Sequence, residues 1–320
     1  MCRSSALRAL ALLLLTALAV AYGGPASYAA APPPPAPGAS APTSAGGDDS
    51  YWTARRMEAA QPVQDSKPAK ASVRSEATVP PSHPFNGIPQ VGTFFWTDGK
   101  NIGRFCGGTV VRSPRRDLVV SAGHCLSHPD PKRHLSFVPQ YHDGLKPFGI
   151  FPVSAIYIDP RYYALGSGKG ARWDYSVERL APRQDGREVE DVAGGFDLAV
   201  YSGYAHSHVR LIGYPGFSDA SHPKPLDCWS STHKYTSTDP GAPGDFLEIA
   251  CAAYIDGTSG GPFLVRDPFG YALIGVIGGY HTGGDTPDIS YSSYFTKDTL
   301  ALYVHAVLGD PPAGGGQPAA

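Results

Sequence analysis

The sequence is poor in charge: charged residues make up 17% of its 320 residues, and the formal net charge is only -2. Such a chain lacks the basic surface that binding to nucleic acid or to an anionic membrane requires. It also lacks any run of 18 apolar residues, which an ordinary transmembrane helix needs. We therefore expect no nucleic acid among its partners and, once an export signal is removed, no membrane.

Helix-breaking residues, by contrast, are abundant, with 38 glycines and 32 prolines. This composition disfavours a helical architecture and predicts many turns. From about Phe85, short apolar runs alternate with turn residues, which is typical of β-strands. The candidate strands are 93–96, 109–111, 118–120, 151–158, 197–201, 208–212, 246–250, 262–265 and 271–277. Their spacing predicts an all-β barrel or sandwich.

The two ends of the chain differ from this pattern. Residues 1–31 combine two arginines, an apolar core and small residues, which predicts a signal peptide and a secreted, extracellular protein; an uncleaved anchor is the alternative. Residues 32–84 are rich in proline and alanine and indicate either a linker or a propeptide. Near the other end, Thr296 can cap an amphipathic helix that Gly309 ends. Residues 310–320 are expected to be a disordered tail.

Only five cysteines are present, and Cys2 lies within the predicted signal peptide. The four that remain allow three pairings, and export favours disulfides over free thiols. We expect the sequential pairing, Cys106 with Cys125 and Cys228 with Cys251. A zinc site is the competing interpretation, but the cysteines and histidines lack its usual spacing, so no metal or other cofactor is expected.

A serine flanked by glycines stands in the segment Gly257-Thr258-Ser259-Gly260-Gly261-Pro262. Acyl transfer needs a nucleophilic oxygen and two amide donors that face the developing oxyanion. Ser259 can supply the first, and the amides of Gly257 and Ser259 can supply the second. An ordinary glycine-rich turn is the alternative.

A hydroxyl nucleophile also needs a nearby base, for which histidine is the usual side chain. Among 11 histidines, His124 is distinguished by its context, Ser121-Ala122-Gly123-His124-Cys125, directly after an apolar run. These two segments together resemble the histidine and serine motifs of the trypsin-like serine peptidases. The resemblance covers roughly residues 85–309 and implies two six-stranded antiparallel β-barrels with a C-terminal helix, and an active site between the barrels.

The resemblance is strongest to the secreted bacterial V8-like, or glutamyl-endopeptidase-like, branch. Thr258 precedes the serine where trypsin has the aspartate that receives a newly cut N-terminus, so that activation switch cannot operate here. Ala253 stands where trypsin has its base-binding aspartate, so cleavage after lysine or arginine is not expected. His281 precedes a Gly-Gly pair and resembles the pocket histidine of this branch, although it needs one extra residue to align. It predicts a modest preference for glutamate before the cleaved bond; a loop histidine that faces water is the alternative.

A carboxylate should orient His124, and two aspartates compete for this role. Asp174 lies 50 residues after His124 and 85 before Ser259, whereas Asp197 lies 73 after and 62 before. In the trypsin-like template the corresponding separations are roughly 45 and 93 residues. The separations of Asp174 are closer to these values, so we favour Asp174.

The predicted function is therefore a secreted, monomeric serine endopeptidase that acts on proteins or peptides through His124, Asp174 and Ser259. One alternative is a catalytically inactive binding protein of the same fold. Another is an esterase of the α/β-hydrolase fold, because Gly257-x-Ser259-x-Gly261 also fits its nucleophile elbow. Too few residues follow Ser259 to build the βα units that this second fold requires.

Overall fold

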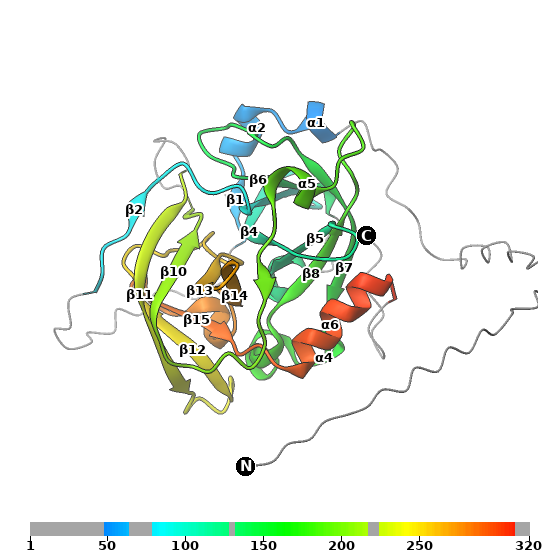
Figure 1. Cartoon of the computed structure of the whole chain (residues 1–320). Coiled ribbons are helices and arrows are strands. Elements are labelled where there is room, and N and C mark those ends of the chain that lie inside the picture. Colours follow the sequence, from blue (N-terminus) through cyan, green and yellow to red (C-terminus); the bar gives the residue numbers. More distant parts are fainter. Residues whose placement is uncertain (1–47, 64–78, 128–131, 217–223, 311–320) are drawn as a thin grey trace, which may run out of the picture. The chain divides into compact units, whose positions relative to one another are not determined.

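The computed structural model of the chain describes residues 48–63, 79–127, 132–216 and 224–310 (Figure 1). All of them belong to one unit of the chain, residues 40–320. The predicted signal peptide and, apart from Asp310, the predicted tail lie outside the described residues. No helix in the described ranges is long and apolar enough to cross a membrane.

Six antiparallel strands form the first barrel, in the order β4-β3-β6-β7-β8-β5, and it closes because β5 pairs back with β4. Phe94 on β3 lies 4.9 Å from Phe137 on β6, ring to ring, whereas the next residue, Phe95, packs on Trp52. Consecutive side chains of a strand point to opposite faces, so both faces of β3 are covered. The strands are β3 (Val91–Thr97), β4 (Gly103–Val111), β5 (Leu118–Ser121), β6 (Arg133–Pro139), β7 (Phe151–Ile158) and β8 (Ser176–Leu180).

The second sheet also has six antiparallel strands, in the order β15-β12-β11-β10-β13-β14. Its two outer strands meet where Val276 donates its N–H to Ser292 Oγ at 2.9 Å and Gly278 donates to the carbonyl of Tyr291 at 3.0 Å. The strands are β10 (His206–Gly213), β11 (Leu226–Thr236), β12 (Asp245–Ala250), β13 (Pro262–Asp267), β14 (Gly270–Val276) and β15 (Ile289–Ser293), with β2 (His83–Pro84) on β11 and β9 (Asp197–Leu198) on β14. The predicted all-β class is confirmed.

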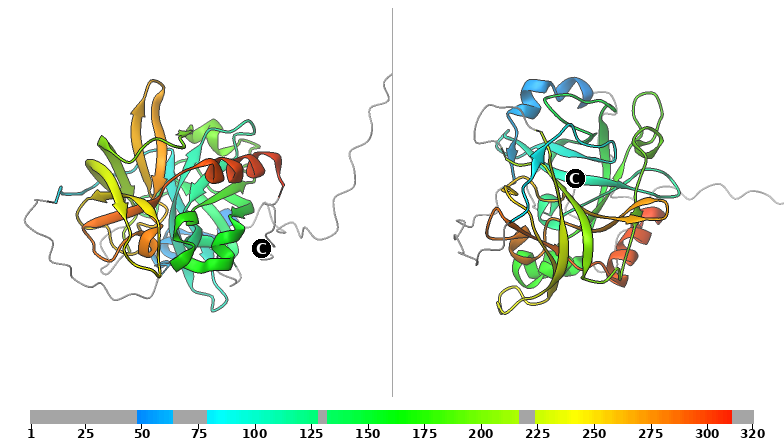
Figure 2. Two further views of the ribbon diagram at one scale, coloured as in Figure 1. Left: turned by 90° about the horizontal axis from the view of Figure 1, so that it is seen from below. Right: turned by 60° about the vertical axis from the view of Figure 1, so that its left-hand side comes forward.

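The predicted C-terminal helix is present as α6 (Lys297–Leu308). Thr296 caps it, because its side chain accepts the N–H of Asp298, and Gly309 ends it in a left-handed conformation with φ 85°. Arg179 on β8 donates to the carbonyls of Ala306 and Val307 in the last turn, which fixes the helix to the first barrel (Figures 1 and 2).

Ordered structure begins well before Phe85, where we expected the folded part to start. Helices α1 (Asp48–Tyr51) and α2 (Ala54–Glu58) pack on the first barrel, and β1 (Gln61–Pro62) runs parallel to β4. Trp52 and Met57 are fully buried in the same core as the barrel strands, and the Trp52 indole donates to the carbonyl of His134 at 2.7 Å. Two large apolar residues in a polar stretch were too weak a signal to predict this packing.

Several elements were not predicted, and each has a polar or glycine-containing sequence. They are the strands β6, β8, β11 and β15 and the helices α3 (Gly123–Leu126), α4 (Pro160–Lys169) and α5 (Val189–Ala193), besides the short 3-10 helices η1 (Ala171–Trp173) and η2 (Tyr280–Gly283). Conversely, the strand predicted over residues 197–201 is reduced to β9, which has two residues. Tertiary packing buries these polar strands although their sequences have a weak intrinsic preference for the β conformation.

Candidate catalytic site

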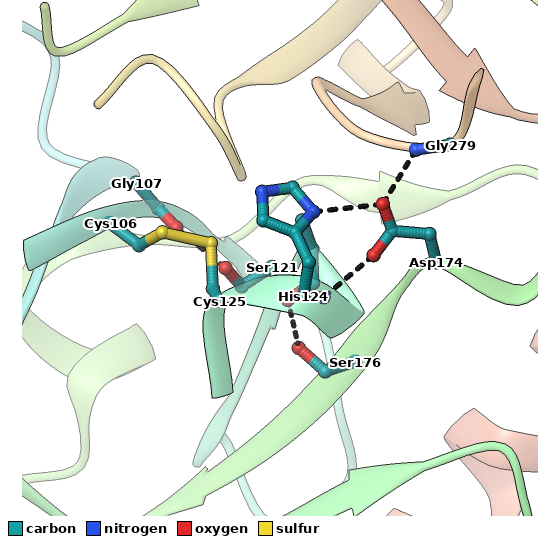
Figure 3. Close-up of a disulfide and its surroundings, with 9 residues drawn as sticks. Cys106, Gly107, Ser121, His124, Cys125, Asp174, Ser176 and Gly279 are labelled. Carbon is teal, nitrogen blue, oxygen red and sulfur yellow. Dashed lines mark hydrogen bonds and ion pairs between the residues drawn. A yellow bond between two sulfur atoms is a disulfide. The ribbon is translucent and has the colours of Figure 1, made fainter. Parts of the chain in front are cut away.

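His124 lies on α3, the single helical turn that follows β5, and its side chain is only 3% exposed. The next residue, Cys125, forms a disulfide with Cys106 on β4 (Figure 3). The turn that carries the histidine is thereby covalently attached to a neighbouring strand of the first barrel. Such an attachment restricts the position of the imidazole.

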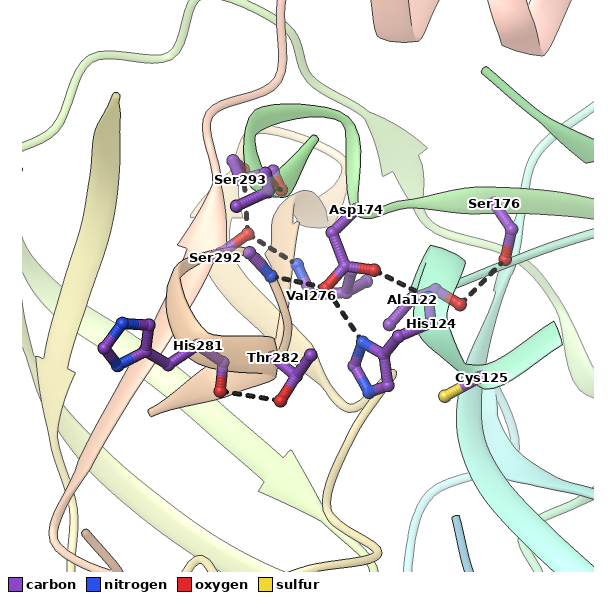
Figure 4. Close-up of polar contacts among 12 residues, drawn as sticks. Ala122, His124, Cys125, Asp174, Ser176, Val276, His281, Thr282, Ser292 and Ser293 are labelled. Atoms are coloured by element: carbon purple, nitrogen blue, oxygen red, sulfur yellow. Dashed lines mark hydrogen bonds and ion pairs between the residues drawn. The ribbon is translucent and has the colours of Figure 1, made fainter. Parts of the chain in front are cut away.

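Asp174 lies between η1 and β8 and is completely buried. Its Oδ2 faces His124 Nδ1 at 2.8 Å, and its Oδ1 accepts the backbone N–H of His124 at 2.7 Å. Oδ2 also accepts the N–H of Gly279 at 2.7 Å (Figures 3 and 4). The carboxylate is therefore held by three donors, in the orientation that a histidine-orienting group needs.

Asp197, the competing aspartate, is not brought to His124. Its carboxylate pairs with Arg112 Nη1 at 2.8 Å, and both side chains are more than one-third exposed. This hydrogen bond raises the pKa of Arg112 above its ordinary value. The structure thus places Asp174, and not Asp197, beside the imidazole.

Ser259 lies in the turn that precedes β13. Its carbonyl accepts the N–H of Gly107 on β4 at 2.8 Å, and the next residue, Gly260, donates to the carbonyl of Ile277 at 2.9 Å. The serine turn is thus fixed on one side to the strand beside the Cys106–Cys125 disulfide and on the other to the segment that contacts Asp174. Within the described residues no hydrogen bond involves Ser259 Oγ. The hydroxyl and His124 are therefore not joined by a hydrogen bond.

The backbone amides of Gly257 and Ser259 donate to no group within the described ranges. Gly257 has φ 96°, and a methyl group on it would lie 2.8 Å from both the Phe105 ring and the N of Gly216. Only glycine fits this position. The carbonyl of Asp256 accepts the N–H of Gly216 at 2.5 Å, so the trans peptide directs the N–H of Gly257 to the opposite side. Both amides are free to receive an oxyanion.

Thr258 stabilises this turn from within. Its hydroxyl donates to the carbonyl of Ile255 at 2.8 Å, and its N–H donates to the same carbonyl at 3.2 Å. The side chain is buried. The turn is therefore held by its own backbone and by the Thr258 hydroxyl, without the aspartate and newly cut N-terminus that trypsin uses.

His281 does not offer the free N–H that we predicted for a substrate glutamate. Its Nδ1 lies 2.5 Å from Asp285 Oδ2 and its Nε2 lies 3.0 Å from Asp239 Oδ2. The ring stacks on Tyr280 and points away from Asp174 (Figure 4). A substrate carboxylate at this place would approach two carboxylates and be repelled.

Both disulfides follow the sequential pairing that we expected. Cys228 on β11 bonds to Cys251, directly after β12, and so links two neighbouring strands of the second sheet. Cys106, His124 and Cys125 bring ligand-type atoms within 4.8 Å of one another. Because the two sulfurs are bonded to each other, they offer no thiolates for a metal ion.

Some of the supporting groups were not predicted. Gly279 contributes only a backbone N–H, and a methyl group on Gly278 would lie 3.1 Å from Asp174 Oδ2. Ser176 Oγ donates to the carbonyl of Ala122, just before the helix of His124, at 3.3 Å (Figure 4). The consecutive glycines after Ile277 were the only sequence signal for this close approach.

No family model and no curated protein matches the sequence itself. Solved structures do match the fold. The protease Anisep from Arthrobacter nicotinovorans matches with a TM-score of 0.59 and 21% identity, over 71% of this chain and 99% of that one. The thermostable serine protease AL20 from an extremophilic microorganism gives 0.57 and 21%, over 69% and 98%.

A Glu endopeptidase gives a TM-score of 0.52 at 16% identity, over 71% of this chain and 96% of that chain. Nearly the whole length of each of these three structures is covered. At such identities the likeness concerns the fold. The chain has the chymotrypsin fold that is found in these serine proteases.

Proposed function

We propose that the protein is a secreted serine endopeptidase in which Ser259 is the nucleophile, His124 the general base and Asp174 the group that orients the histidine. The observation that carries this proposal is the buried Asp174 carboxylate, which meets His124 Nδ1 at 2.8 Å and two backbone N–H groups. A carboxylate at Nδ1 selects the tautomer whose Nε2 can accept a proton.

In the first half-reaction, Ser259 Oγ attacks the carbonyl carbon of the substrate while its proton passes to His124 Nε2. The oxyanion that forms is stabilised by the N–H groups of Gly257 and Ser259. His124 then gives the proton to the leaving amine, which departs as the acyl-enzyme forms. Water attacks the ester in the second half-reaction, with the same proton transfers, and frees the carboxylic acid and the serine.

Secretion is supported by the two buried disulfides, because such bonds persist in oxidising compartments. Export through the N-terminal segment remains a prediction from its composition. The substrates are expected to be proteins or peptides. The glutamate preference also remains a prediction, and it now needs a donor other than His281 as this structure places it.

Labelling with a fluorophosphonate tests the proposal, because the reagent modifies only a serine that an adjacent base activates. Peptide mapping should locate the label on Ser259, and neither Ser259→Ala nor His124→Ala should be labelled. The inactive binding protein of the same fold would leave all three chains unlabelled. Label on another serine would assign the nucleophile elsewhere.

A further inference from the structure

Strand β1 occupies a place on β4 immediately beside the serine turn. Gln61 pairs with Arg104 and Pro62 with Phe105, and Val63 donates its N–H to the carbonyl of Phe105 at 3.3 Å. Two positions further along β4, Gly107 holds the carbonyl of Ser259. Residues two apart in a strand direct their backbone groups to the same edge. The β1 segment and the serine turn therefore share one edge of β4.

Pro62 also lies close to the peptide group between Asp256 and Gly257, on the side of its carbonyl. A methyl group on Gly216 would lie 2.9 Å from the Pro62 ring and 2.7 Å from the carbonyl of Asp256. That carbonyl belongs to the peptide group whose N–H is supplied by Gly257. One glycine thus separates Pro62 from the carbonyl face of the turn, the face opposite to the Gly257 N–H.

The chemistry of the proposed reaction shows on which side of Ser259 the β1 segment lies. The leaving amine takes its proton from the ring of His124, so the chain beyond the cleaved bond departs next to that ring. The Cys106 and Cys125 sulfurs lie within 4.8 Å of a His124 ring nitrogen, and Figure 3 shows the disulfide on the side of the ring opposite Asp174. The leaving chain therefore passes over the disulfide, toward Phe105.

A substrate in extended conformation would find its natural backbone partner there in the edge of β4. The carbonyl of Phe105 already accepts the N–H of Val63. The segment before it is firmly anchored, because Trp52, Met57 and Ala60 are buried in the core of the barrel. Burying the tryptophan and methionine side chains stabilises this attachment.

We infer that residues 61–63 form a fixed wall on the leaving-group side of Ser259 and thereby limit how far a substrate can extend beyond the cleaved bond. This inference rests on the proposed function. It makes Pro62 and Val63 specificity-determining residues.

The test compares two substrates with the same acyl sequence, chosen from a peptide-library profile of the parent protein. One ends in 4-nitroanilide directly after the cleaved bond, and the other continues for several residues. The variants are Pro62→Gly/Val63→Gly, which loosens the wall, and Val63→Pro, which removes the N–H to Phe105 and also restricts the backbone at residues 62 and 63. Arg55→Ala, on the exposed surface of α2, is the matched control.

The ratio of kcat/KM for the extended substrate to that for the 4-nitroanilide should rise about three- to tenfold in both variants, the equivalent of one backbone hydrogen bond. The control should keep the parent ratio. The 4-nitroanilide rate shows that the site of each variant is intact. An unchanged ratio in a variant that keeps this rate overturns the inference alone. A parent protein that cleaves neither substrate overturns the proposed function as well.

Discussion

Asp174 accepts a hydrogen bond of 2.7 Å from the backbone N–H of Gly279, which lies 105 residues further along the chain. The aspartate precedes a strand of the first barrel, and the glycine follows a strand of the second sheet. The carboxylate that meets His124 is thus oriented from both halves of the fold. Its geometry depends on how the two sheets pack, and not only on local structure.

Replacing Asp174 by asparagine should lower kcat by about 10⁴, because the amide N–H₂ favours the wrong imidazole tautomer. Asp197→Asn is the matched control, since that residue pairs with Arg112 on the surface and should leave turnover within a factor of about two. Steady-state kinetics on one peptide substrate measures both. A larger loss in the Asp197 variant would transfer the role to that residue.

Gly257→Ala should lower kcat about 10²-fold or more, by displacing the N–H that faces the oxyanion. A Cβ at this φ of 96° would lie 2.8 Å from the backbone of Gly216. Gly186→Ala provides the control, because Gly186 also has positive φ but no atom within 4 Å of the added methyl. Equal losses in the two variants would indicate that backbone strain, and not the oxyanion site, is responsible.

The base must be neutral to accept a proton, so kcat/KM should fall as the pH drops through the range in which histidine is protonated, about 6.5 for a free side chain. The profile is measured with the parent protein under conditions in which its circular dichroism is unchanged. A rate that stays constant down to about pH 4 would exclude His124 as the base.

The pairing of His124 with Asp174 was predictable for two reasons. The motif around the histidine is a local sequence pattern, and the number of residues between the two can be read from the sequence. The C-terminal helix was also predictable, since Thr296 and Gly309 mark its ends. The contact of His281 with Asp239 was not, because Asp239 lies 42 residues earlier in the chain and only the folded second sheet brings the two together.

The N-terminal segment shows a second limit of sequence reasoning. A stretch such as 48–63 has too few apolar residues to fold alone, and its composition therefore resembled a linker. Trp52 and Met57 are buried in the core of the first barrel, where Trp52 packs on Phe95 of β3. Such complementarity between distant segments has no local signature.

Glu178 on β8 is fully buried, and this burial raises its pKa to about 8, from an ordinary value of 4.5. Between these two values the unfolded chain loses the proton while the folded protein keeps it. The free energy of unfolding should therefore decrease as the pH rises from 4.5 to 8, by about 1 kcal/mol per pH unit from this group.

Glu178→Gln removes this titration and should be more stable than the parent at pH 8, with a smaller dependence on pH. The exposed Glu58→Gln should retain the parent profile. Urea unfolding at several pH values measures the effect. Parallel profiles for the parent and the Glu178 variant would show that this carboxyl is ionised in the folded protein.

The most direct test of the account is kcat for peptide hydrolysis by Ser259→Ala, compared with the parent protein at equal stability. The account predicts a loss of about 10⁶-fold, with only the residual catalysis of binding and oxyanion stabilisation left. Because Ser259 Oγ makes no hydrogen bond within the described residues, its removal should leave the fold intact. Near-parental turnover in the alanine variant would contradict the assignment of Ser259 as nucleophile.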